Sequence, residues 1–200
     1  MTTRIRDIIA KVESNNSDIL RDVPGEIERI EDLSTEEKIG LSQALASLFY
    51  LFEASGSVTM LRLAVQTQRQ LASFGPDVLP FLFHELAEAD IESAAYLGKA
   101  FAKIGKPGAD YIVGEWDRYR DDEHARINLI QTFSYYRISE VTDALPLMID
   151  AIRQQSALSE AALYAIARLV ERSRGIEIDP RLARTLFASV PGFVSAEQPI

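Results

Sequence analysis

Apolar residues recur along the chain at the spacing of amphipathic helices, and no segment shows the alternation of a half-buried strand. Glycine and proline interrupt this pattern at short intervals, for example at Gly75-Pro76 and Pro107-Gly108. The stretches between these breaks have helix length. The pattern therefore predicts an all-α fold with helices at roughly 3–14, 25–32, 35–54, 57–73, 77–88, 91–104, 108–120, 123–136, 140–154, 158–173 and 180–189.

Several of these helices have recognisable start signals. Ser34 is followed three residues later by Glu37, which is the spacing of a capping box. Asp90 and Asp122 stand where a side chain can cap the first amide groups of a helix. Pro107 lies where the first turn of a helix tolerates proline. These signals support the predicted starts of four helices.

Four predicted helix ends share one register, which indicates an internal repeat. A large apolar residue recurs at spacings of 30, 32 and 33, in the order Leu71, Phe101, Phe133 and Ile166. Three positions later a second apolar column follows, made of Phe74, Ile104, Tyr136 and Leu169. Each residue of the first column is followed in the sequence by a small residue, Ala or Ser. Gly98 lies inside one of the predicted helices. Small side chains of this kind let two helices cross closely, so we expect tight helix packing there.

The motifs around this register resemble the HEAT-repeat family, in its short bacterial form with PBS-lyase-type HEAT-like repeats. The segment Leu97–Gly105 is similar to the end of the family's second helix, with small residues, an apolar residue and a final glycine. The segments Val78–Leu82 and Ala144–Leu147 are similar to the opening of its first helix. Asp122 and Arg126 match its turn motif, and the resemblance implies that they tie neighbouring repeats together.

The resemblance covers residues 57–173 and implies a right-handed α-solenoid of stacked antiparallel helix pairs, with roughly 9–11 helices. Residues 1–56 match no repeat, and we expect them to form an N-terminal helical cap. A C-terminal capping helix is expected at 174–190, followed by a flexible tail at 191–200.

Composition narrows the class of protein. The 200 residues are 47% hydrophobic, and 21 Lys and Arg stand against 30 Asp and Glu, for a net charge of −9. Such a charge argues against nucleic-acid binding, which depends on basic side chains. The longest apolar run, Ala44–Phe52, is too short to span a membrane, and the N-terminus lacks an apolar signal core. We therefore expect a cytoplasmic protein without membrane insertion.

The sequence offers no catalytic constellation. It contains no cysteine, which excludes disulfides, thiolate metal sites and a cysteine nucleophile. Its two histidines, His84 and His124, stand in no motif with serine or aspartate. The turn Gly105–Gly108 lacks the spacing of a phosphate-binding loop. The sequence therefore favours a non-catalytic protein, and we predict no catalytic residue, metal site or cofactor.

Candidate binding residues follow from the resemblance, because second helices line the concave face of HEAT-like repeats. Their polar positions, together with an aromatic group around residues 116–136, give the predicted binding surface: Tyr96, Lys99, Lys103, Trp116, Tyr119, Arg126, Gln131, Tyr135, Tyr164 and Arg168. Exposed aromatics close to arginines are typical of protein-binding hot spots. The alternative for Trp116 and Tyr136 is plain core packing.

These observations favour a scaffold or adaptor that grips a helix or an extended peptide of another protein on its concave face. The mixture of bases and tyrosines within an acidic chain suits an acidic or amphipathic partner segment. Two alternatives stay open. The first is a tetrapyrrole-handling protein of the phycobilin lyase type, for which a small-molecule ligand is expected. The second is a HEAT-like DNA glycosylase, which would need a basic groove.

Overall fold

The structure is a computed structural model that describes residues 1–51, 58–154 and 156–172. Within these ranges the chain is all-α, with about ten helices and no strand. The α-helices are α1 (Thr3–Glu13), α2 (Ser17–Leu20), α3 (Val23–Glu28), α4 (Thr35–Ser47), α6 (Val58–Ser73), α7 (Leu79–Glu88), α8 (Ile91–Ile104), α9 (Lys106–Gly114), α10 (Glu123–Thr132), α11 (Leu145–Ile152) and α12 (Ala157–Arg172). Short 3-10 helices link them: η1 (Gly75–Val78), η2 (Trp116–Tyr119), η3 (Phe133–Tyr135), η4 (Ile138–Glu140) and η5 (Thr142–Ala144).

The predicted helices are largely confirmed, and the differences lie at their ends. The helix predicted at 25–32 is wrong in extent, because α2 and α3 divide residues 17–28 between them. The helices predicted at 108–120 and 123–136 are too long, since α9 stops at Gly114 and α10 at Thr132. Each then tightens into a 3-10 turn that directs Trp116 or Phe133 into the core. Within the helix predicted at 35–54, α4 ends at Ser47 and residues 49–51 are helical again, whereas residues 52–54 lie outside the described residues. The helix predicted at 180–189 also lies outside them.

The predicted start signals are confirmed at the atomic level. The amide of Glu37 donates to Ser34 Oγ at 3.3 Å, and the amide of Ser34 donates to Glu37 Oε2 at 3.2 Å, which completes the capping box. Asp90 Oδ1 accepts from the amide of Ser93 at 2.8 Å, and Asp122 Oδ1 accepts from that of Ala125 at 3.0 Å. These caps satisfy amide groups that a helix start leaves without partners.

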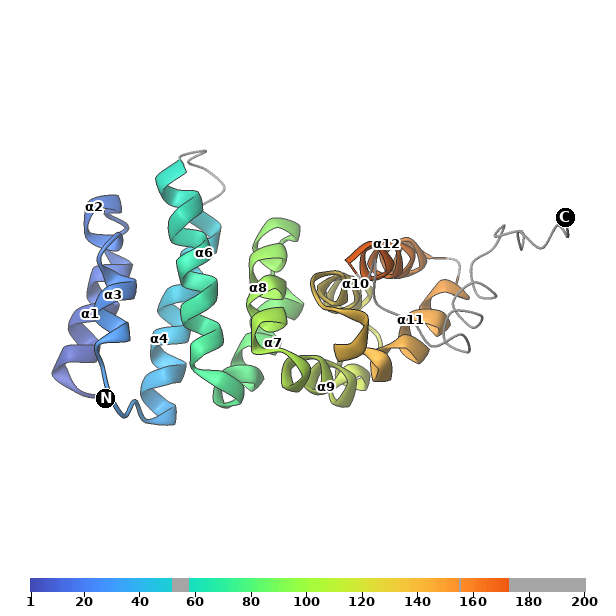
Figure 1. The fold of residues 1–200 in the computed structure, drawn as a ribbon, viewed down its shortest axis with the longest axis horizontal. Coiled ribbons are helices and arrows are strands. Elements are labelled where there is room, and N and C mark those ends of the chain that lie inside the picture. Colours follow the sequence, from blue (N-terminus) through green and yellow to red (C-terminus); the bar gives the residue numbers. More distant parts are fainter. Residues whose placement is uncertain (52–57, 155, 173–200) are drawn as a thin grey trace, which may run out of the picture.

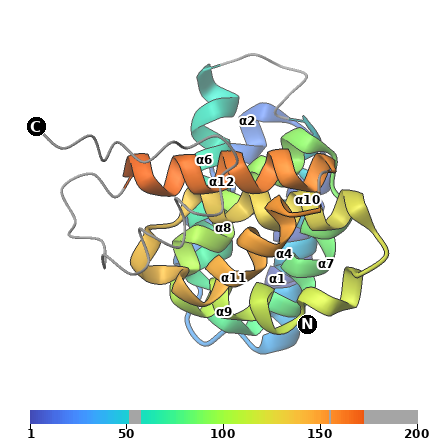
Figure 2. The ribbon, with the colours of Figure 1, turned by 90° about the vertical axis from the view of Figure 1, so that its right-hand side faces the viewer.

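From α4 onward the helices stack in two layers (Figure 1). We call α6, α8, α10 and α12 the front layer, in which each helix contacts the next. The back layer contains α4, α7, α9 and, through η5, α11. In Figure 1 α6 and α8 run nearly vertically, whereas α10 and α12 are seen close to end-on, so the direction of the helices turns along the stack. Figure 2 shows α12 lengthwise, in front of α10.

The two apolar columns of the repeat register belong to the core. Leu71, Phe101, Phe133 and Ile166 are all buried, one in each front-layer helix or its 3-10 extension. In the second column Phe74, Tyr136 and Leu169 are buried, and Ile104 is half-buried. The columns therefore form part of one continuous core that runs through the stack.

Two glycines allow the helices to approach closely, as expected at Gly98. A Cβ atom there would lie 2.9 Å from Thr132 Oγ1 and 3.0 Å from Tyr135 Cε2. A Cβ at Gly108 would lie 2.7 Å from the Tyr136 hydroxyl and 2.9 Å from the Phe101 carbonyl oxygen. Any larger residue would push these groups apart.

At the N-terminal end of the stack, α1 and α3 pack against α4 and α6. The C-terminal helix expected at 174–190 and the tail expected at 191–200 lie outside the described residues. Among the described helices, none has the length and apolar character needed to cross a membrane.

Glu37 gives the stability of the fold a defined pH dependence. Hydrogen bonds from the Thr2 amide and from Ser34 lower the pKa of Glu37 to about 2. We predict that Glu37→Gln lowers the free energy of unfolding at neutral pH. Because the folded-state pKa is lowered, this difference is full above the ordinary pKa of 4.5 and vanishes as the pH falls to about 2. Chemical denaturation of both proteins across this range measures the difference, and a difference that does not change with pH would contradict the assignment.

Gly108 and Gly114, both in α9, form a matched pair for testing close packing. We predict that Gly108→Ala lowers the free energy of unfolding by about 1–3 kcal/mol, because the added methyl group meets the Phe101 carbonyl. At Gly114 no atom lies within 4 Å of the place that a Cβ would take, so Gly114→Ala is expected to be neutral or to stabilise by about 0.5–1 kcal/mol. Urea denaturation measures both values, and equal effects would refute the packing argument.

Candidate functional site

The most distinctive surface feature is a group of cations and tyrosines on the front layer. Lys99 Nζ lies 5.3 Å from the ring centroid of Tyr96 and 5.5 Å from that of Tyr135. Arg172 Cζ lies 5.9 Å from the Tyr135 ring, and Arg172 also donates to the Tyr135 carbonyl oxygen at 3.4 Å. The three distances to the rings are in the range of cation–π contacts. We call Tyr96, Lys99, Tyr135 and Arg172 the Lys99 cluster.

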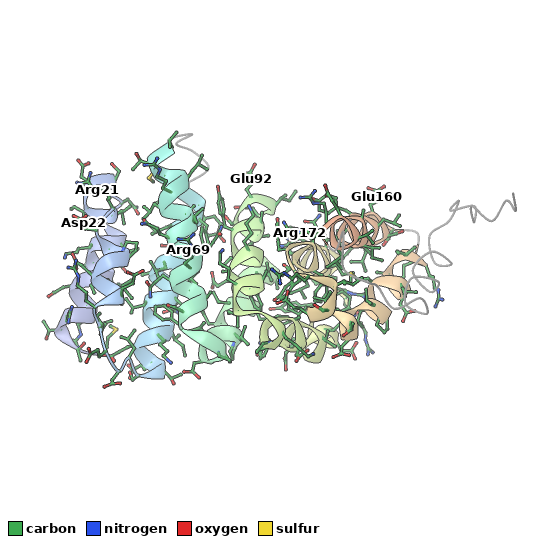
Figure 3. All side chains as sticks on the ribbon, in the orientation of Figure 1. Arg21, Asp22, Arg69, Glu92, Glu160 and Arg172 are labelled. Atoms are coloured by element: carbon green, nitrogen blue, oxygen red, sulfur yellow. The ribbon has the colours of Figure 1, made fainter. Side chains whose placement is uncertain are left out.

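The fold brings these four residues together from three elements. Tyr96 and Lys99 are one turn apart on α8, Tyr135 ends η3, and Arg172 lies in the last turn of α12. The η3 segment contacts both α8 and α12, which brings Tyr135 next to one cation from each of these helices. In Figure 3 the labelled Arg172 points from α12 towards α8.

Core packing holds both tyrosine rings in place. Tyr96 stacks on the buried Phe49, with ring centroids 5.2 Å apart and planes 6° apart. Tyr135 lies against the backbone of α8 at Gly98, where a side chain would collide with its ring. Both rings are therefore positioned before any ligand arrives, which lowers the entropic cost of binding.

The electrostatics of the cluster are unusual for an acidic protein. Lys99 is half-buried, and this burial lowers its pKa below the ordinary lysine value. The neighbouring positive charge of Arg172 lowers the same pKa further. Among the described residues, no ion pair involves either Lys99 or Arg172. Both cations thus lie beside the Tyr135 ring without a counter-charge from the described residues.

Further predicted residues surround the same site. Burial raises the pKa of Tyr135, with an additional contribution from Tyr164, whereas the charges of Arg172 and Arg168 partly offset it. Tyr164 is 53% exposed, and Arg168 is paired with Glu171. The structure therefore brings Tyr164 and Arg168 close to Tyr135, from successive turns of α12.

Two more predicted residues lie at the edge of the cluster. Gln131 is half-buried and, with Tyr135, lines a cavity of about 10 Å³ between α8 and α10. This volume is about enough for one water molecule. Lys103 lies one turn beyond Lys99 on α8 and is exposed.

Trp116, Tyr119 and Arg126 form a separate group, away from the Lys99 cluster. Trp116 is only 7% exposed, and Arg126 Cζ lies 4.7 Å above its ring. The prediction that Trp116 is a surface anchor is therefore wrong, and the alternative of core packing is correct. The η2 turn directs the indole ring inward. Tyr119 is half-buried and its hydroxyl lies 3.1 Å from His84 Nδ1.

The family resemblance implies that Asp122 and Arg126 tie neighbouring repeats together, but in the structure they make other contacts. Asp122 caps its own helix and Arg126 packs on Trp116, which precedes it in the chain. Asn128 makes the link to α7 instead, since its side-chain amide donates to Leu86 O at 3.1 Å and to Ala89 O at 2.8 Å. The asparagine thereby satisfies carbonyl groups at the C-terminal end of α7.

A second part of the front surface, on α6, contains no residue that was predicted from the sequence. Val58, Leu61 and Val65 are 66%, 51% and 43% exposed and follow one face of this helix. Arg62, Gln66 and Arg69 line the same shallow groove. No acidic residue occurs in α6. This surface was not predicted because the repeat register includes only Leu71, near the C-terminal end of α6, and Phe74, just after it. The exposed apolar residues lie earlier in the helix.

Arg172 was also missed, although a signal for it exists. Tyr164, Arg168 and Arg172 are spaced by four residues, which places them on one face of a helix. The apolar repeat register ends at Leu169 and does not extend to the end of α12.

The described residues contain no group of three or more His, Asp or Glu side chains that could hold a metal ion. The sequence matches no family model, no curated protein matches it, and no solved structure matches its fold.

Proposed function

We propose that this chain is a HEAT-like α-solenoid that acts as a non-catalytic scaffold or adaptor, binding a segment of another protein on its front layer. The solenoid assignment is supported by two features. Large apolar residues repeat at spacings of 30, 32 and 33 and are buried at equivalent places in successive front-layer helices. Each front-layer helix contacts the one before and after it, which is the arrangement of stacked repeats.

The observation that carries the binding proposal is the unneutralised Lys99 cluster in an acidic chain. In α6 and α8 together, two arginines and two lysines stand against one glutamate, so these helices are net positive in a chain of net charge −9. The half-buried rings of Tyr96 and Tyr135 and the exposed apolar stripe of α6 lie among these bases. A partner segment with acidic and apolar side chains fits such a surface through both charge and burial of apolar area.

Tyr164 and Tyr50 allow a matched test, because both are exposed tyrosines, at 53% and 48%. Tyr164 borders the Lys99 cluster, whereas Tyr50 is surrounded by Glu85, Asp90 and Glu88. Peptides are first selected against the wild-type protein from a phage-displayed random library. We predict that Tyr164→Ala weakens binding of the selected peptides by about tenfold, since exposed aromatic anchors dominate such interfaces. Tyr50→Ala is expected to change it by less than about twofold.

Isothermal titration calorimetry measures the affinities, and thermal unfolding verifies that each midpoint stays within about 2 °C of the wild type. Selected peptides that bind Tyr164→Ala as tightly as the wild type would place the binding surface elsewhere. A library that yields no enriched peptide would reject the proposal.

A further inference from the structure

Two positively charged side chains, Lys99 and Arg172, lie close to the ring of Tyr135. Lys99 Nζ lies 5.5 Å and Arg172 Cζ 5.9 Å from the centroid of this one ring. The two side chains come from different helices, so local sequence does not force them together. Lys99 is half-buried and therefore partly stripped of water, and the like charge of the exposed Arg172 repels it, which is unfavourable in the free protein.

Three other lysines of the described chain are paired with carboxylates, whereas the exposed Lys103 forms no ion pair with a described residue. Lys11 meets Glu26 Oε1 at 2.6 Å, and Lys38, whose side chain is 24% exposed, meets Asp77 Oδ2 at 2.6 Å. Lys106 is paired with both Asp110 and Asp143. The chain thus supplies carboxylates to these lysines, including a rather buried one, but the described residues supply none to Lys99. A bound anion would complete the Lys99 cluster in the same way.

We infer that Lys99 and Arg172 together bind one carboxylate group from an aspartate or glutamate side chain of a partner protein, with the Tyr135 ring beneath it. This inference rests on the proposed function and names the chemistry that the site recognises. An ammonium and a guanidinium group offer several N–H donors to the two oxygens of a carboxylate. A singly charged carboxylate is favoured over a doubly charged phosphate, because the flanking tyrosine rings partly exclude water and a dianion loses more hydration energy.

The neighbouring helix defines the rest of the partner segment. The apolar residues Val58, Leu61 and Val65 lie on α6, which packs against α8, and Arg69 stands on the same groove. In Figure 3 the labelled Arg69 lies on the front of α6. A helix with one apolar and one acidic face would place apolar groups on α6 and a carboxylate at the Lys99 cluster. The partner is therefore an amphipathic acidic segment.

The first test uses a hexaglutamate peptide with both ends blocked as the probe, at constant ionic strength to hold screening fixed. We predict that it raises the thermal midpoint of the wild-type protein by about 3 °C or more at concentrations well above its Kd. Lys99→Gln and Arg172→Gln are expected to lose at least half of this rise. Lys103→Gln removes the same charge from the exposed next turn of α8 and is expected to keep it. A blocked hexaglutamine peptide is expected to cause no rise.

Two outcomes of this test would overturn the inference. In the first, Lys99→Gln and Arg172→Gln respond to hexaglutamate as the wild type does. In the second, inorganic phosphate at the same ionic strength raises the wild-type midpoint as much as hexaglutamate, which would indicate a general anion site.

A second test separates this inference from the proposed function. Each acidic residue of the library-selected peptides is changed to its amide, and binding is measured to the wild type, Lys99→Gln and Lys103→Gln. We expect one acidic position to lose about fivefold to tenfold in affinity on the wild type and almost none on Lys99→Gln, because a shared interaction is non-additive. Peptides that bind without any such coupling would refute the carboxylate site while leaving the proposed function intact. If the library yields no peptides, the proposed function fails, and the hexaglutamate test still decides on the carboxylate site.

Discussion

The close approach of α8 to the α10–η3 segment at Gly98 is the constraint on which the candidate site depends. A Cβ at this position would lie 2.9 Å from Thr132 Oγ1 and 3.0 Å from Tyr135 Cε2, so only glycine leaves room for the tyrosine ring. The Tyr135 ring then lies against α8, close to Lys99. Because η3 also contacts α12, the same ring lies close to Arg172. A packing requirement of the core therefore creates the surface arrangement of the Lys99 cluster.

The direction of the helices contributes to the separation of charge on this acidic protein. Glu92, Glu123 and Glu160 lie in the first turns of α8, α10 and α12, whereas Lys103 and Arg172 lie in last turns. This distribution complements the helix dipoles. In Figure 3 the labelled Glu92 and Glu160 lie along the upper edge, while Arg69 and Arg172 lie below it. Charges that stabilise single helices thus also separate an acidic edge from a basic front.

The all-α class and most of the helices could be predicted from the sequence, because periodicity and caps are local properties. The Ser34–Glu37 capping box and the apolar column from Leu71 to Ile166 depend only on spacing along the chain, and the structure contains both. The 3-10 turns after α9 and α10 could not be predicted in this way. They depend on tertiary packing, which directs Trp116 inward and makes it part of the core. The position of Arg172 against Tyr135 likewise requires contact between elements far apart in sequence.

NMR spectroscopy can establish whether Lys99 sits between the rings of Tyr96 and Tyr135 in solution. Protons above an aromatic ring are shielded by its ring current. We predict that the Lys99 ε-methylene protons are shifted upfield of ordinary lysine values and show nuclear Overhauser effects to both tyrosine rings. In Gly98→Ala, where the added methyl group displaces the Tyr135 ring, the effect to Tyr135 is expected to weaken or disappear. An ordinary chemical shift without contacts to either ring in the wild-type protein would contradict the account.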